Sequence, residues 1–161
     1  MKEIEIKTTF RSFASESELP PKEAGLLEAA KSVLGNAYAP YSRFQVAAAV
    51  LLANGEMVTS TNYENASYPI CVCAEHSALI AAANRFPNVP PIAVAITVKS
   101  PHRTIGRPAL PCGSCRQVIC ETEQKNNHPI EVILQGEEGE IFVFENGKHM
   151  LPLAFDASFL G

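Results

Sequence analysis

The residues of this sequence with the strongest chemical potential are cysteines, and three of them are spaced like metal ligands. Cys112 and Cys115 form a Cys-x-x-Cys in the stretch "LPCGSCRQVIC", and Cys73 lies well before them in "ICVCAEHSALIAAANRF". Both stretches are typical of a helix beginning, where unpaired backbone N–H groups and the helix dipole favour thiolates. Two such helix ends that meet would present three thiolates to one metal ion, and Zn²⁺ is the natural occupant of a tetrahedral thiolate site.

An acidic residue next to this set gives it a possible catalytic use. Three protein ligands leave the fourth position of zinc for water, which separates a catalytic zinc from a closed structural one. Zinc lowers the pKa of that water, but a neighbouring group must still move its protons. Glu75 lies two residues after Cys73 and could reach the water without binding the metal. The sequence therefore predicts a metal ligand and a proton shuttle on one helix turn.

Other uses of the cysteines stay open at this point. The "CGSC" stretch could be a thioredoxin-like redox pair, and the whole set could be a non-catalytic zinc-binding module. Cys71 or Cys120 could supply a fourth sulfur to a structural zinc site. However, Cys71 is unusually close to Cys73 for a ligand pair, and Cys120 points elsewhere on its helix. We interpret both as ordinary buried cysteines.

The elements that would position these residues alternate between strand and helix patterns. Apolar spacing predicts an amphipathic helix over residues 21–37, and Asn54-Gly55 between two apolar runs predicts a hairpin with a type I′ turn. Further helices are expected over residues 73–85 and 113–123, and further strands over residues 92–99, 130–135 and 140–145. This order favours a three-layer α/β/α sandwich around a mixed five-stranded sheet.

Length and composition indicate one domain of ordinary globular type. The chain has 161 residues, 47% of them hydrophobic and 19% charged, with a net charge of −4. We expect an N-terminal appendage over residues 1–20, with a short strand from Ile4 to Phe10, and a single domain over residues 21–161. The acidic balance argues against nucleic acid as a partner, and the short apolar runs argue against a membrane span or secretory signal. We expect a cytoplasmic protein with reduced cysteines.

Several motifs together resemble one known family. "CAE" followed by "PCGSCRQV" resembles the zinc signature of the cytidine deaminases, in their small, three-cysteine, homotetrameric class. "NAYAPYSRFQVAAAV" is similar to the family's first-helix exit and strand, "NYENASYP" to its nucleoside-binding segment, and "LPLAF" to its C-terminal aromatic segment. The resemblance extends from about residue 22 to residue 155 and implies the cytidine deaminase-like fold.

The resemblance implies a reaction and a metal site. Cys73, Cys112 and Cys115 would bind one Zn²⁺ per chain. Glu75 would take a proton from the zinc-activated water, deliver it to N3 of the cytosine ring and later help to protonate the departing ammonia, while hydroxide attacks C4. The implied activity is hydrolysis of a C–N bond of a cyclic amidine: cytidine and 2′-deoxycytidine become uridine and 2′-deoxyuridine, in pyrimidine salvage.

The resemblance also implies a substrate site shared between subunits. Phe44 matches an aromatic residue that packs against the base, and Asn62 and Glu64 match a pair that hydrogen-bonds the ribose hydroxyl or the base. Ala66 and Tyr68 match positions near the site of an adjoining subunit, and Phe155 matches an aromatic residue donated across the interface. The expected partners are thus a nucleoside and further copies of the chain, in a homotetramer with composite sites.

The sequence departs from the family pattern at a few positions. His76 stands where three-cysteine members usually carry an arginine that offsets the anionic cluster, and we expect it to support the thiolates from the side, as Arg116 also would. Gln45 and Ala47 replace the usual proline and glycine. The histidine leaves one further substrate class open, a modified cytosine nucleoside such as blasticidin S.

Overall fold

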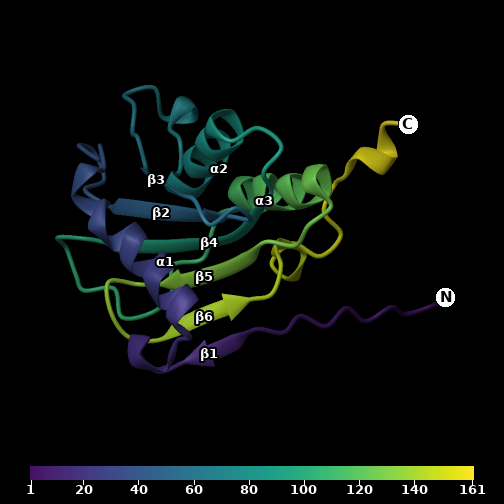
Figure 1. The fold of residues 1–161 in the computed structure, drawn as a ribbon, viewed down its shortest axis with the longest axis horizontal. Helices are drawn as coiled ribbons and strands as arrows, with labels where there is room; N and C mark the ends of the chain where they lie inside the picture. Colours follow the sequence, from purple (N-terminus) through teal and green to yellow (C-terminus); the bar gives the residue numbers. More distant parts are fainter.

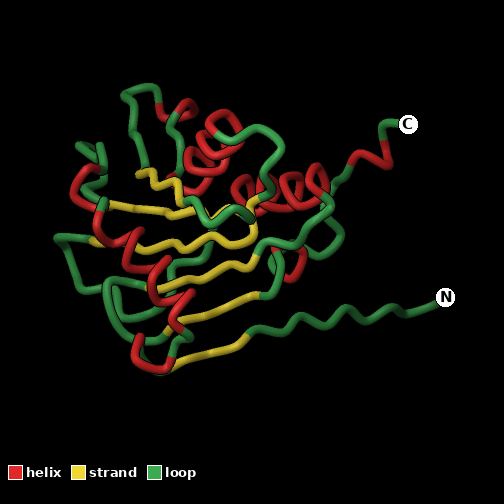
Figure 2. The backbone as a smooth tube through the Cα atoms, viewed as in Figure 1, coloured by secondary structure: helices red, strands yellow, loops and turns green.

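The computed structural model describes residues 1–161, and its centre is a six-stranded mixed sheet (Figures 1 and 2). The strands are β1 (Arg11–Phe13), β2 (Gln45–Leu52), β3 (Met57–Thr61), β4 (Pro91–Lys99), β5 (Glu131–Gln135) and β6 (Ile141–Phe144), and their spatial order is β1-β6-β5-β4-β2-β3. The helices are α1 (Pro21–Ser32), α2 (Ala74–Arg85) and α3 (Gly113–Asn126), with short 3₁₀ helices η1 (Glu16–Glu18), η2 (Leu34–Asn36), η3 (Tyr68–Ile70), η4 (Gly147–His149) and η5 (Ala157–Phe159).

The three predicted layers are confirmed. Helix α1 covers one face of the sheet, and α2 and α3 cover the other (Figure 1). Strands β4 and β5 are parallel, whereas every other neighbouring pair is antiparallel, so the sheet is mixed as expected. The order of strands and helices along the sequence therefore predicted the architecture correctly.

The number of strands differs from the prediction by one, because the N-terminal strand joins the sheet. Strand β1 pairs with β6 over residues 11–13, whereas residues 4–10, where the strand was predicted, form none. The alternation of Ile4 and Ile6 indicated a strand with one buried face, but both side chains are exposed. Leu19 is also buried in the core, so residues 11–19 pack with the domain; the division of the chain at residue 20 stays a prediction.

Two apolar clusters hold the layers together, one on each face of the sheet. In β2, Ala48, Val50 and Leu52 face α2 and α3, while Ala49 and Leu51 between them face α1. This alternation is the period of two that an extended strand imposes on its side chains. Because β2, β4 and β5 are covered on both faces, they are almost continuously apolar.

The β2–β3 hairpin was predicted correctly, but its turn type was wrong. Gly55 has a φ of +86°, whereas Asn54 is not among the residues with positive φ, and a type I′ turn requires positive φ at both positions. The Gly55 N–H donates to the Leu52 carbonyl and the Leu52 N–H donates to the Glu56 carbonyl, which leaves a loop of residues 53–55. Such a loop has its left-handed residue in third place, and glycine fills it without strain.

The connections bring two helix beginnings to one end of the sheet. Helix α2 follows β3 and helix α3 follows β4, and these two strands run in the same direction because both are antiparallel to β2. The N-termini of α2 and α3 therefore lie at the same sheet end, together with the start of β2 and the start of β6. None of the helices is long and apolar enough to cross a membrane.

Candidate metal centre

The three predicted ligands come together at this end of the sheet. Cys73 is the N-cap residue of α2, Cys112 is the N-cap residue of α3, and Cys115 lies in the first turn of α3. Their Sγ atoms all lie within 4.8 Å of one another, and the Cys112 and Cys115 sulfurs are 3.6 Å apart. Both N-caps lack a side-chain cap hydrogen bond, so the unpaired N–H groups of two helices point toward the thiols.

Glu75 is buried beside the thiols. Its side chain lies in the first turn of α2, and the residue is 4% exposed. One carboxylate oxygen, Oε2, is buried without a hydrogen-bond partner from the protein. A buried carboxylate oxygen without a partner is costly unless a ligand or water completes it, so Glu75 is placed to hold a proton of a bound molecule.

The thiols perturb one another in a way that calls for a cation. A hydrogen bond from the Cys115 thiol lowers the pKa of Cys73 to about 7, while the same bond raises the pKa of Cys115. Burial and the negative charge of Glu75 act in the same direction on Cys115 and oppose the ionisation of Cys73. Three sulfur ligands gathered beside a buried carboxylate favour a positive ion between them. The donor set fits zinc, which binds thiolates and compensates their charge.

Arg116 ties the ligand loop to the C-terminal part of the chain. Its Nε donates to the Pro111 carbonyl at 2.8 Å, and its Nη1 donates to the Met150 carbonyl at 2.8 Å. Because Pro111 directly precedes Cys112, the guanidinium fixes the backbone on which that ligand stands. The supporting role of Arg116 stays a prediction, and these contacts would exert it through the backbone.

The two remaining cysteines differ from each other. Cys120 is buried on α3, as predicted, whereas Cys71 is exposed, so that prediction was wrong for Cys71. The sulfur of Cys71 accepts a hydrogen bond from the Asn65 N–H at 3.2 Å, which closes the loop of residues 65–71. This sulfur is not part of the cluster formed by the other three cysteines.

The residues predicted to hold the nucleoside form a connected group around the start of β2. The Asn62 amide accepts a hydrogen bond from the Val46 N–H at 2.8 Å and donates one to the Phe44 carbonyl at 2.9 Å. The Glu64 carboxylate accepts hydrogen bonds from the N–H of Tyr41 and from the N–H and hydroxyl of Ser42. The Ser42 hydroxyl, with these N–H groups, lowers the pKa of Glu64. Asn62 and Glu64 thus fix the segment that carries Phe44, and their binding role stays a prediction.

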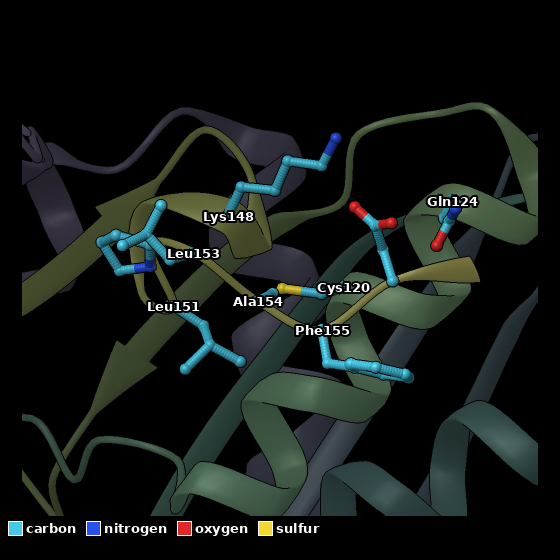
Figure 3. A pocket seen from close by; sticks show the side chains of 9 residues that line it. Cys120, Gln124, Lys148, Leu151, Leu153, Ala154 and Phe155 are labelled. Atoms are coloured by element: carbon cyan, nitrogen blue, oxygen red, sulfur yellow. The ribbon is translucent and has the colours of Figure 1, made fainter. Parts of the chain in front are cut away.

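The residues predicted to serve an adjoining subunit are exposed in the single chain. Ala66 lies in the loop before α2, and Tyr68 begins the 3₁₀ helix η3 and is 67% exposed. Phe155 is 58% exposed, stacks on Phe159 and lines a cavity of about 270 Å³ with Cys120 (Figure 3). The Phe155 carbonyl also accepts a hydrogen bond from the Gln117 side chain on α3 at 2.7 Å.

The positions that depart from the family pattern fall in two places. His76 is half-buried in the first turn of α2, beside Glu75, and forms no side-chain hydrogen bond within the chain. Gln45 and Ala47 alternate with Val46 and Ala48, and so share the α1 face of β2 with Ala49. Gln45 and Ala47 therefore lie on the opposite face of the sheet from α2 and α3, the helices that carry the metal ligands.

One buried acidic residue was not singled out from the sequence. Glu123, near the end of α3, accepts hydrogen bonds from the Ile130 N–H at 2.8 Å and the Gly147 N–H at 2.7 Å. It joins α3 to the start of β5 and to η4. Nothing local in the sequence identifies Glu123, because its hydrogen-bond partners become its neighbours only after folding. The one signal in the sequence was an acidic residue on the inner face of a predicted helix.

Fold and site together define a class of protein: an α/β/α sandwich with a zinc–thiolate centre at the N-termini of two helices and a buried carboxylate beside it. Comparison with known proteins gives the family. Residues 21–128 match the family described as "Cytidine and deoxycytidylate deaminase zinc-binding region". The chain belongs to this family, which confirms the expected resemblance.

Individual relatives agree with this assignment. The chain is 41% identical over 133 residues to a cytidine deaminase of Halalkalibacterium halodurans, which covers 82% of this chain and 92% of the relative. The crystal structure of cytidine deaminase from Burkholderia pseudomallei superposes with a TM-score of 0.71 at 38% identity, over 81% of this chain and 97% of that one. The cytidine deaminase structure from Mycobacterium tuberculosis gives a TM-score of 0.63 at 29% identity, over 82% and 95%.

Proposed function

We propose that the protein is a cytidine deaminase, a hydrolase that converts cytidine and 2′-deoxycytidine to uridine and 2′-deoxyuridine with release of ammonia. The observation that carries this proposal is the buried Glu75 carboxylate, with one oxygen unpartnered, beside three thiols within 4.8 Å of one another. The similarity to proteins named cytidine deaminase supports the choice of substrate.

Each residue has a defined task in this proposal. Cys73, Cys112 and Cys115 would hold one Zn²⁺, which would supply the positive charge that makes water nucleophilic near neutral pH. Glu75 would accept a proton from the attacking water at Oε2 and transfer it to N3 of the cytosine ring; it would then take the proton of the hydroxyl now bound to C4 and pass it to the amino group, so that ammonia leaves and the C4 carbonyl of uridine forms. Its burial excludes bulk water, which strengthens the hydrogen bonds that it makes to the ring.

The substrate is held by the residues around the start of β2. We assign Phe44 to packing against the base, and Asn62 and Glu64 to hydrogen bonds with the ribose. The backbone contacts of Asn62 and Glu64 support this assignment, because they fix both side chains before substrate arrives. His76 and Arg116 are assigned to the support of the thiolates.

The proposal extends to the assembly and the cellular role. We assign the chain to a homotetramer, in which Ala66, Tyr68 and Phe155 complete the site of an adjoining subunit. The exposure of Tyr68 and Phe155 supports this, because large aromatic side chains are enriched at interfaces. The same proposal places the enzyme in the cytoplasm and in pyrimidine salvage, and gives it neither nucleic acid nor membrane as a partner.

The alternatives are less well supported. A thiol-redox pair would need only Cys112 and Cys115, yet Cys73 and the buried Glu75 are brought to the same place. A closed structural zinc site would need a fourth sulfur, and Cys71 and Cys120 stand outside the cluster. A modified nucleoside such as blasticidin S is tested with the substrate panel described next.

The deciding experiment is ammonia release from a panel of cytosine compounds by wild-type protein and by Glu75→Gln. The panel is cytidine, 2′-deoxycytidine, cytosine and blasticidin S. We expect turnover of the first two, and a fall in kcat of at least about 100-fold in the variant, with zinc content unchanged. Turnover that persists in Glu75→Gln, or absence of turnover by zinc-loaded wild type, would contradict the proposal.

A further inference from the structure

The N-terminal arm, residues 1–10, has a strand-like sequence but no strand partner within its own chain. It leads into β1 as an extended segment that stands away from the body of the molecule, and all of its residues are exposed (Figure 1). Ile4 is 76% exposed and Ile6 is 50% exposed, and both share one side of an extended chain. The arm therefore presents an apolar stripe that the chain itself leaves uncovered.

The base of the arm is fixed beside an open edge of the sheet. The Phe10 ring packs on Phe142 and Phe144, with ring centroids 4.6 Å and 5.0 Å apart. The Thr8 hydroxyl donates a hydrogen bond to the His149 carbonyl. Strand β1 follows directly, and β6 is its one neighbour in the sheet. Unpaired backbone groups at a sheet edge are a template for a further strand, so the arm is placed where another strand can add.

The charge pattern of the arm indicates what kind of strand would add. The side-chain charges of the arm sum to zero, from Lys2, Glu3, Glu5 and Lys7. A balance of zero favours neither a nucleic acid nor an anionic membrane as the partner. The arm also lies outside residues 21–128, which match the family, so the metal site does not account for it. A complementary partner needs an apolar stripe beside charges of both signs, and a second copy of the same arm offers both.

We propose that the N-terminal arms of two copies of the chain pair as antiparallel strands about a two-fold axis, with Ile6 of each copy opposite Ile6 of the other. In this register, Glu5 of each copy lies opposite Lys7 of the second copy, and the two apolar stripes lie on the same side of the pair. Opposite charges in facing positions stabilise an antiparallel pair, and like charges in facing positions destabilise it. A two-fold axis makes each of these contacts twice.

The sequence selects this register over its neighbours. A shift by two residues places Glu5 opposite Glu5, or Lys7 opposite Lys7. A shift by one residue places Ile6 opposite one of these charged residues and divides the apolar stripe between the two sides. Within one chain, the Lys7 ammonium and the Glu5 carboxylate are 4.0 Å apart, with side chains 81% and 78% exposed. Such an exposed pair is weak, so both groups remain available to a second copy.

The first experiment uses single cysteine variants of the full, zinc-loaded chain with oxidised glutathione. In Ile6→Cys, the two introduced thiols would face each other across the two-fold axis, with Cβ atoms about 5 Å apart, so we expect most chains to become covalently linked pairs. Ile4→Cys is the matched control, because its two thiols would lie about 13 Å apart along the strands and cannot be linked without backbone movement. Electrophoresis without reductant measures the linked fraction, mass spectrometry identifies the linked positions, and wild type gives the background from the native cysteines.

The greater exposure of Ile4 makes this comparison decisive. Thiols that meet by random collision would link Ile4→Cys at least as fast as Ile6→Cys, and that result would overturn the inference. An arm that stays single, or that serves a different protein, would give no linked pairs in Ile6→Cys above the wild-type background, and this would also overturn it. Neither outcome involves cytidine turnover, so the test is separate from that of the proposed function.

The second experiment tests the facing charges with the same disulfide. Glu5→Lys and Lys7→Glu, each combined with Ile6→Cys, should form linked pairs about fivefold more slowly, because like charges would then face each other. A one-to-one mixture of the two variants should recover the rate, since each introduced charge then faces one of opposite sign. Glu3→Lys is the control, because Glu3 lies opposite Thr9 in this register, and it should change the rate by less than about twofold. No recovery in the mixture, or a larger effect of Glu3→Lys than of Glu5→Lys, would overturn the proposed pairing.

Discussion

At the residue scale, the metal site depends on which sulfurs are ligands, and two exposed cysteines allow a matched comparison. Cys112 belongs to the cluster, whereas Cys71 does not. We predict that Cys112→Ser lowers zinc content well below one ion per chain, because loss of one of three thiolates weakens the site. Cys71→Ser should retain full zinc. Metal analysis after gel filtration measures both, with circular dichroism as the check on folding; zinc loss in Cys71→Ser would indicate a four-sulfur site.

A second prediction at this scale concerns Arg116, which donates a hydrogen bond to the Pro111 carbonyl directly before Cys112. Arg116→Ala should speed the transfer of zinc to a coloured chelator by about tenfold or more, as expected for the loss of a contact that orients a ligand. The rate of zinc transfer in Arg116→Lys should lie between the rates of Arg116→Ala and wild type. Lysine keeps the positive charge, but its ammonium group lacks the planar guanidinium geometry that bonds both carbonyls at once. Lys125→Ala, an exposed change on the same helix, is the control; an equal effect there would refute a specific role.

At the element scale, two glycines at the loop between β4 and α3 have different surroundings: Gly106 lies in the loop, and Gly136, after β5, packs against it. A Cβ on Gly136 would overlap backbone oxygens, whereas a Cβ on Gly106 would meet nothing within 4 Å. We predict that Gly136→Ala destabilises the protein by about 1–3 kcal/mol, because the loop must shift to admit the methyl group. Gly106→Ala should be nearly neutral. Denaturant unfolding measures the difference, and similar free energies of unfolding for the two variants would contradict the prediction.

The elements also indicate what the sequence could predict. The helices with Cys73 and Cys112 at their beginnings, and the buried strand over residues 92–99, were predictable because their patterns are local. The turn at Asn54-Gly55 was mistaken because Asn-Gly also fits a loop with the left-handed residue in third place. Strand β1 was missed because a three-residue edge strand is defined by its partner β6 rather than by its own pattern.

At the same scale, the chemical types of the site residues were easier to predict than their contacts. Cys-x-x-Cys and Cys-x-Glu restrict the chemistry strongly, and the cluster of thiols formed as expected. The exposure of Cys71, the two carbonyls held by Arg116 and the two N–H groups held by Glu123 depend on segments far apart in the sequence. Contacts of that kind become visible only when the fold places the segments together.

At the scale of the whole molecule, Glu123 connects three elements and should matter for stability rather than for catalysis. Glu123→Ala would leave the N–H groups of Ile130 and Gly147 unpaired in the core, at a cost of about 2–5 kcal/mol in the free energy of unfolding. Glu123→Gln keeps an acceptor and should lose less. Denaturant unfolding of both variants tests this; a larger loss in Glu123→Gln than in Glu123→Ala would contradict the explanation.

The last prediction concerns whether a complete site needs two chains. Phe155 is exposed, and within its own chain its ring stacks on Phe159, so we expect Phe155→Ala to lower kcat/KM for cytidine by about tenfold through loss of stacking in a neighbouring site. Glu75→Gln should be almost inactive on its own. When the two variants are unfolded, mixed and refolded with zinc, some sites would combine Glu75 from one chain with Phe155 from the other. The mixture should then exceed the mean of the two separate activities. An activity equal to that mean would indicate that Phe155 serves its own chain, and that the active site is complete in one subunit.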